Sequence, residues 1–151
     1  MNTRNELKLT DEEVKSIAED LEIGMVVYIN KETHEVKTVI DTDNYYADTE
    51  PWEEDLKEIE ENYDKYLEIE KMDSPESYRV MEDFVETVKN EELKKKLELG
   101  LSLSKPFRNF KDIIDDEDEY RNIWFSFRDE RYIEFVKEQI EIYNESINRG
   151  T

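Results

Sequence analysis

The chain of 151 residues contains 42 Asp and Glu residues against 21 Lys and Arg residues, for a net charge of -21. It has no cysteine and one histidine, which excludes disulfides, cysteine nucleophiles, cysteine-based zinc sites and multi-histidine metal centres. No apolar run approaches the roughly 20 residues of a membrane span, and no signal-peptide core opens the chain, so we expect a cytoplasmic protein that does not contact membranes. Aromatic residues make up 11% of the chain and recur at regular spacings, which favours one folded domain over residues 1-151.

The first 40 residues predict a helix followed by a β-hairpin. Thr10 and Glu13 have the spacing of a capping box, and Gly24 is a suitable helix end. The apolar face between them comprises Val14, Ile17, Ala18 and Leu21. Two β-branched stretches, 25-30 and 36-40, then flank a polar turn that contains the only histidine.

Residues 41-55 are acidic and rich in turn-forming residues. A short helix is predicted after Pro51, with its apolar positions at Leu56, Ile59 and Tyr63. Residues 66-70 alternate and predict a third strand, with Leu67 and Ile69 facing inward and Glu68 and Glu70 facing water.

The carboxyl-terminal half predicts helices. Ser74 and Pro75 suit a cap and a first helical position. Apolar spacings continue at Tyr78, Met81, Phe84, Val85, Val88, Leu93, Leu97 and Leu101. Residues 105-131 then carry two aromatic stripes joined by the acidic run 115-119: Phe107, Phe110, Ile113 and Ile114, then Tyr120, Ile123, Trp124 and Phe127. A long last helix extends toward Ile147. The predicted fold class is α+β: a small antiparallel sheet of about three strands covered by several C-terminal helices.

Several short motifs together resemble uncharacterised protein family 0158, a family of small bacterial proteins. They are Met72-Asp73-Ser74, Met81-Glu82-Asp83-Phe84, Leu93 with Leu97, Phe107-Arg108-Asn109-Phe110-Lys111-Asp112, and Trp124 with Phe127. The resemblance covers about residues 22-140 and implies a bacterial, cytosolic α+β protein, with no established activity or catalytic residues. The family often has a glycine just before its Phe-Arg pair, where this chain has Ser104, Lys105 and Pro106.

A base, Arg128, stands four residues after Trp124 in the aromatic stripe that continues from Tyr120 and Trp124 to Tyr132 and Phe135. Arg108 and Lys111 share a face of one predicted helix, while Arg128 and Arg131 border the stripe that contains Trp124. If the helices pack through their aromatic faces, these four bases and Trp124 are candidates for a ligand-binding site, because guanidinium groups bind phosphate or carboxylate and stack on rings. The alternative is structural: Arg128 and Arg131 pair with nearby acids, the candidates being Glu82, Asp112, Asp129 and Glu130.

Three classes of function stay open. The first is a non-enzymatic acidic binding or regulatory module that contacts a basic protein, because residues 1-78 carry 24 acids and 8 bases. The second is a module that binds an anion or nucleic acid at the local basic site. The third is a metal-dependent hydrolase using Glu82, Asp83 or Glu86, although the pattern predicts no cofactor and identifies no catalytic residue.

Overall fold

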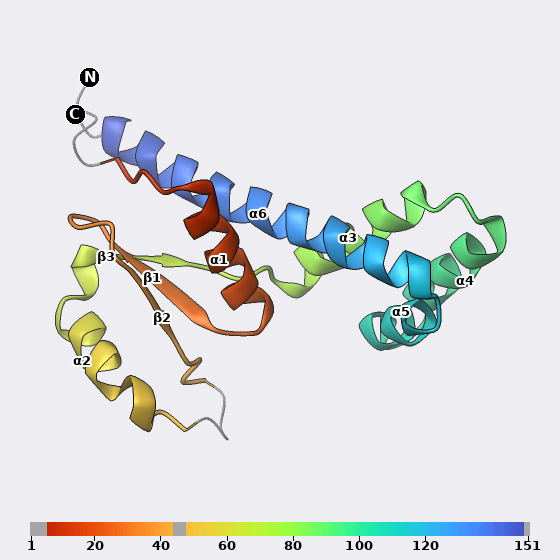
Figure 1. The fold of residues 1–151 in the computed structure, drawn as a ribbon, viewed down its shortest axis with the longest axis horizontal. Coiled ribbons are helices and arrows are strands. Elements are labelled where there is room, and N and C mark those ends of the chain that lie inside the picture. Colours follow the sequence, from red (N-terminus) through yellow and green to blue (C-terminus); the bar gives the residue numbers. More distant parts are fainter. Residues whose placement is uncertain (1–5, 44–47, 150–151) are drawn as a thin grey trace. The chain divides into compact units, whose positions relative to one another are not determined.

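The computed structural model describes residues 6-43 and 48-149, so the first five residues and part of the acidic stretch 41-55 lie outside the described residues. The described residues form two compact units (Figure 1). Unit 1 comprises the chain up to Lys71 and from Tyr132 onward, and unit 2 comprises Met72-Arg131. The α+β class is confirmed by a three-stranded antiparallel sheet and its accompanying helices. A single domain over the whole chain stays a prediction.

Unit 1 begins with helix α1 (Asp11-Glu22) and the sheet. The Thr10 hydroxyl accepts from the Glu13 N-H while the Glu13 carboxylate accepts from the Thr10 N-H, so the predicted capping box is confirmed. All four predicted apolar positions of α1 are buried. Strand β1 (Val26-Asn30) lies between β2 (Val36-Val39) and β3 (Tyr66-Ile69), and both pairings are antiparallel.

The sheet of unit 1 buries side chains on both faces. Val27, Ile29 and Ile69 are almost fully buried on one face. Thr38 lies on the same face, and its hydroxyl donates to Asp20 of α1. The opposite face packs against helix α2 (Glu53-Glu61) and the short η1 (Glu50-Trp52) through a cluster of Val39, Ile59 and Tyr66. The predicted one-sided strand is therefore corrected: Tyr66 is buried because α2 covers the second face. Leu67, which pairs with Ile29 on the first face, is only half-buried. Glu68 and Glu70 are exposed, as predicted.

Tyr63 corrects the predicted extent of the short helix. Helix α2 ends at Glu61, and Tyr63 lies in a separate turn, η2 (Tyr63-Lys65), with 64% of its surface exposed. The reason is local: Asn62 leaves helical geometry and its side-chain amide donates back to Glu58. The next residues can then enter β3.

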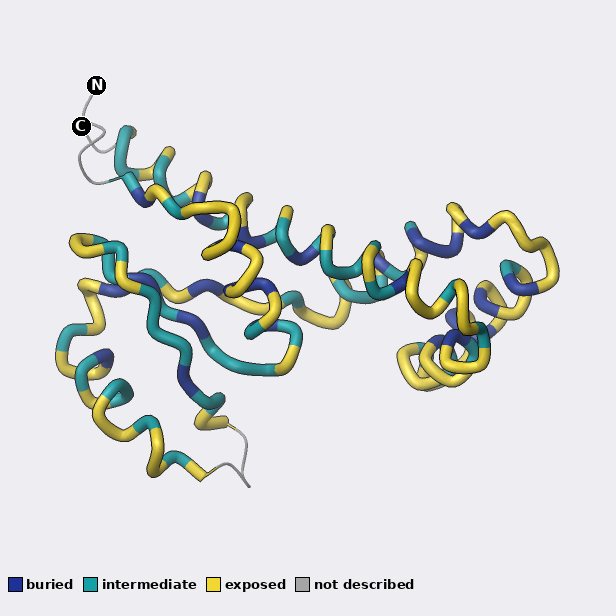
Figure 2. The backbone as a smooth tube through the Cα atoms, viewed as in Figure 1, coloured by how far each residue is buried: buried dark blue, intermediate teal, exposed yellow. Residues whose placement is uncertain are grey.

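Unit 2 consists of helices α3 (Ser74-Thr87), α4 (Glu91-Ser102) and α5 (Pro106-Asp115) and residues 118-131 of helix α6 (Asp118-Arg149). Their buried positions recur at helical spacing and form one core (Figure 2). That core comprises Val80, Phe84, Val85, Val88, Leu93, Leu97, Leu101, Phe110, Ile114 and Trp124. Phe84 is at its centre, with its ring centroid 6.2 Å from that of Phe110 and 5.2 Å from that of Trp124.

Three predictions for unit 2 are corrected. The cap of α3 is Asp73, not Ser74: the Asp73 carboxylate accepts from Glu76 N-H, and Glu76 completes a second capping box. Ile123 and Phe107 keep 46% and 36% of their surface exposed, so neither belongs to the buried core. The helical spacing correctly identified α5 and α6. The core is small, however, and buries only the residues along the middle of each apolar face, whereas Phe107 and Ile123 lie at its edges.

The two helices α4 and α5 approach closely at Gly100. A Cβ atom at this position would lie 3.0 Å from Ile113 Cδ1 and 3.3 Å from Asn109 Cβ. The Asn109 side-chain amide donates to the carbonyls of Gly100 and Ser104, both at 2.9 Å. Gly100 therefore allows α4 and α5 to cross closely, because any larger side chain would meet Ile113 and Asn109.

Candidate functional site

The two units differ clearly in net charge. Unit 1 carries 26 acidic and 10 basic residues, a net charge of -16, whereas unit 2 carries 16 acidic and 11 basic residues, a net charge of -5. The densest part of unit 1 is residues 48-70, which we call the acidic segment. It has 11 acids and 2 bases and includes α2 and β3.

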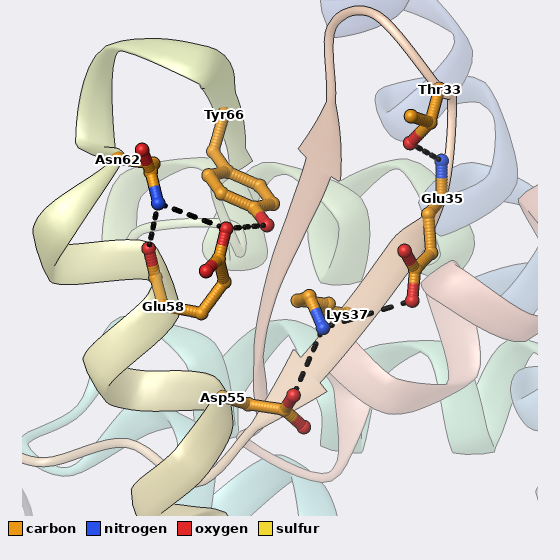
Figure 3. Close-up of polar contacts among 7 residues, drawn as sticks. All are labelled: Thr33, Glu35, Lys37, Asp55, Glu58, Asn62 and Tyr66. Atoms are coloured by element: carbon orange, nitrogen blue, oxygen red, sulfur yellow. Dashed lines mark hydrogen bonds and ion pairs between the residues drawn. The ribbon is translucent and has the colours of Figure 1, made fainter.

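Part of the acidic segment is occupied with internal contacts (Figure 3). The Lys37 ammonium lies 3.0 Å from the Asp55 carboxylate, whose hydrogen bond raises the pKa of Lys37. The Glu58 carboxylate accepts from the Asn62 amide and from the Tyr66 hydroxyl. These contacts join α2 to the sheet and to the turn that follows it, so Asp55 and Glu58 have structural roles.

Other acids of the segment face solvent. Glu53, Glu54, Glu60 and Glu61 are all exposed, and none has an ion pair within residues 6-43 and 48-149. The helix dipole separates them into two groups. Glu53 and Glu54 lie in the first turn of α2, where negative charge is favourable, whereas Glu60 and Glu61 lie at its C-terminal end, where no base accompanies them. Helix stability therefore does not account for Glu60 and Glu61.

The predicted basic site is distributed over different surroundings. Trp124 is only 6% exposed and packs against Phe84 and Phe110, with its ring centroid 4.8 Å from that of Phe110. Arg131 donates to the Asp83 carboxylate at 2.8 Å and lies over the ring of Phe127. The structural alternative thus describes Arg131, with Asp83 as the partner instead of the four acids considered from the sequence.

Arg128 and the α5 bases lie elsewhere. Arg128 stacks over Phe125 at 5.2 Å, and its guanidinium is 3.9 Å from Asp129, one of the predicted partners. Arg121 lies over the same ring at 5.1 Å. Arg108 and Lys111 are exposed, and in the described part of the chain neither has an ion pair. A ligand site that unites Trp124, Arg108, Lys111, Arg128 and Arg131 stays a prediction.

The carboxylate candidates do not gather into a metal centre in the structure. Asp83 is held by Arg131, while Glu82 and Glu86 are exposed on α3. Across residues 6-43 and 48-149, no group of three or more Asp, Glu or His side chains is arranged to hold a metal ion. In the acidic run, Asp115 pairs with Arg121 at 3.4 Å, and Asp118 and Glu119 occupy the first turn of α6.

Sequence reasoning missed a pair of side-chain amides on α6 that bind extended backbone. The Gln139 amide accepts from Glu70 N-H at 2.9 Å and donates to Glu70 C=O at 2.8 Å. Asn144 does the same for Leu7, at 2.8 and 3.1 Å. The only signal in the sequence was the position of Gln139 within an otherwise apolar stripe. Beside the Asn144-Leu7 contact is an open groove of about 530 Å³, lined by residues of mixed charge from the chain before and within α1 and from the second half of α6.

A family model described as Uncharacterised protein family (UPF0158) matches residues 8-147. The chain belongs to this family. The match extends the resemblance deduced from the motifs through α1 and along α6 as far as Ile147. No curated protein and no solved structure matches the chain. Among the described residues, no helix is both long enough and apolar enough to span a membrane. The family supplies no reaction, so function is argued from the surface of the chain.

Proposed function

We propose that this UPF0158 chain is a non-enzymatic interaction module whose acidic segment binds a basic protein. The observation that carries the proposal is the placement of Glu60 and Glu61, exposed and unpaired among the described residues at the end of α2 where the helix dipole opposes them. A basic partner would supply the positive charge that offsets the repulsion between these carboxylates and the negative end of the helix dipole. A negative field of this density also accelerates the encounter with a basic partner.

The rigidity of the segment supports the proposal. The Lys37-Asp55 ion pair and the contacts of Glu58 fix α2 against the sheet (Figure 3). The buried contacts of Ile59 and Tyr66 do the same from the apolar side. Because the helix is held on one side, its exposed carboxylates keep fixed spacings, which lowers the entropy lost on binding.

The test compares two charge-neutralised variants of equal net charge. The first is Glu53→Gln, Glu54→Gln, Glu60→Gln and Glu61→Gln in the acidic segment. The matched control is Glu82→Gln, Glu86→Gln, Glu91→Gln and Glu92→Gln, four exposed acids of unit 2. Each variant and the wild type are immobilised, exposed to nuclease-treated bacterial lysate, and eluted with increasing salt.

We expect the wild type and the control to retain the same basic protein, released as salt rises, and the segment variant to lose it. Release by salt follows because exposed charges are screened beyond about 8 Å at physiological ionic strength. Equal retention by all three baits, or retention that salt does not weaken, would contradict the proposal.

A second candidate, binding of a small anion, is favoured by Arg108 and Lys111, which are exposed and unpaired in the described part of the chain. Inorganic phosphate is the first probe. Stabilisation of the wild type that disappears in Arg108→Gln/Lys111→Gln would support this function, because a ligand stabilises the state it binds. Identical melting of both proteins at all phosphate concentrations would exclude a phosphate site there.

A further inference from the structure

A small region of this acidic chain is basic. Residues 94-111, from the middle of α4 to the middle of α5, contain six bases and one acid, a net charge of +5. We call this region the basic corner. Lys95, Lys96, Lys105, Arg108 and Lys111 are exposed, and none of them has an ion pair within residues 6-43 and 48-149. In a chain with twice as many acids as bases, unpaired bases in one place are unexpected.

The basic corner also exposes large apolar side chains. Leu99 keeps 60% of its surface exposed, Leu103 keeps 55% and Phe107 keeps 36%. They follow one another at intervals of four residues along the α4-α5 connection. The ring of Phe107 meets that of Tyr78 edge-on at 6.4 Å, and the Tyr78 hydroxyl donates to Leu101 C=O. The apolar surface is therefore held in position by the fold.

The backbone of the basic corner is strained at a basic residue. Lys105 caps α5 with φ of 57° and ψ of 55°, a left-handed conformation that favours glycine. Asn109 donates through its backbone N-H to Lys105 C=O and through its side chain to Ser104 C=O, which holds this geometry. A lysine at a position where glycine would cost less indicates that its side chain has a role.

We propose that the basic corner of one molecule binds the acidic segment of a second copy of this chain. The two regions have opposite charge, +5 against -9, and each combines charge with exposed apolar surface: Leu99, Leu103 and Phe107 on one, Tyr63 on the other. The exposed leucines favour a protein over a nucleic acid, because phosphates offer them no apolar contact. The inference rests on the acidic segment being an interaction surface, as proposed above.

Ionic strength decides whether this contact forms. The charge of -21 makes two copies repel each other at long range. At about 0.15 M salt that repulsion is screened beyond about 8 Å, while groups in direct contact still interact. The experiment therefore uses physiological salt.

Sedimentation equilibrium of the purified chain tests the proposal. The wild type should gain mass with concentration. Two charge reversals should each weaken self-association about tenfold: Lys105→Glu/Arg108→Glu in the basic corner and Glu60→Lys/Glu61→Lys in the acidic segment. A mixture of the two variants should associate again. The corner variant keeps an intact acidic segment, and the segment variant keeps an intact basic corner that can bind it. The control Lys15→Glu/Lys89→Glu has the same net charge as the corner variant but alters exposed bases elsewhere, and it should behave as the wild type.

Circular dichroism melting shows that each variant is folded before its mass is interpreted. A wild type that stays one chain in mass up to about 1 mM protein would overturn the inference. So would variants that each associate as strongly as the wild type, or a mixture that associates no more than its components. Failure here is distinguishable from failure of the proposed function, because mass is measured on the purified chain alone and partner capture on lysate.

Discussion

Units 1 and 2 keep their structure in different ways. Unit 2 is held by an aromatic core, in which Phe84 contacts Phe110, Trp124 and Phe127. Unit 1 has a smaller share of aromatic packing and adds polar contacts between segments far apart in sequence, such as Asn144 with Leu7 and Gln139 with Glu70. The difference indicates where each unit is sensitive. Substitutions in the core should damage unit 2 most, and loss of single hydrogen bonds should damage unit 1.

The largest expected effect is in the core of unit 2. Phe84→Ala removes a ring that is completely buried, and should lower the free energy of unfolding by about 3-5 kcal/mol. Ile123→Ala, on the exposed side of α6, should change it by no more than about 0.5 kcal/mol. Denaturant titration followed by fluorescence measures both. Equal effects of the two substitutions would contradict this description of the core.

The same experiment sharpens the comparison, because each unit contains one tryptophan: Trp52 in unit 1 and Trp124 in unit 2. In a Trp52→Phe background fluorescence reports unit 2, and in a Trp124→Phe background it reports unit 1. If Phe84→Ala shifts both signals together, the chain unfolds as the single domain predicted from its sequence. If only the Trp124 signal shifts, the units unfold separately.

A smaller effect is expected from the amide contacts of unit 1. Asn144→Asp keeps the acceptor for Leu7 N-H but replaces the donor to Leu7 C=O by a second oxygen, so it should cost about 1-3 kcal/mol. The equivalent change Gln139→Glu removes the donor to Glu70 C=O in an exposed setting and should cost less than about 1 kcal/mol. The Trp52 fluorescence transition measures both, and the reverse order of costs would show that burial does not control these contacts.

The sequence predicted the elements of the two units unequally well. Helical spacing identified the central core of unit 2, because Phe84, Leu97, Phe110 and Trp124 lie on regular apolar stripes. The residue types placed the cap of α3 one residue late, because Asp73 and Ser74 are both good capping residues. Only the structure shows that the Asp73 carboxylate accepts from the Glu76 N-H. It missed the second face of the sheet because α2 is mostly charged, and its few apolar positions gave no sign that they cover Tyr66.

The candidate site was harder to predict than the fold. Composition already indicated the acidic half of the chain. The repulsion between Glu60 and the negative end of the α2 dipole could be recognised only once the structure showed that α2 ends at Glu61. The basic site was predicted from neighbours along the helices. Arg131 instead pairs with Asp83, 48 positions away, and Trp124 is buried in the core. Pairings across elements depend on tertiary packing, which periodicity does not specify.

Each unit has one described non-glycine residue in left-handed geometry, His34 in unit 1 (φ 65°) and Lys105 in unit 2 (φ 57°). Relief of this strain should make His34→Gly and Lys105→Gly each more stable by about 0.5-1 kcal/mol. Alanine keeps a Cβ atom, so His34→Ala and Lys105→Ala should give no gain. Thermal melting of the four variants measures the effect. Destabilisation by both glycines would show that the side chains contribute more than the backbone costs.

The last expected effect is a pH dependence in unit 1, which appears only above pH 10. Burial, and then the neighbouring Glu68 carboxylate, raise the pKa of Tyr28 from 10.0 to about 12. Its hydroxyl donates to Glu68 at 3.4 Å, and loss of the proton would place two negative groups side by side. Below pH 10 both folded and unfolded chains hold this proton. Between pH 10 and about 12 only the folded chain does, so stability falls with pH across that window.

Tyr28→Phe isolates this contribution. Other groups titrate in the same range, including Lys37, whose pKa is also raised, so the informative quantity is the difference in slope between the wild type and the variant. The unfolding free energy of Tyr28→Phe, measured through Trp52, should fall less steeply than that of the wild type between pH 10 and about 12. In a chain that unfolds as two units, the Trp124 transition should show no such difference. Equal slopes at Trp52 would mean that the Tyr28 hydroxyl titrates alike in the folded and unfolded chains.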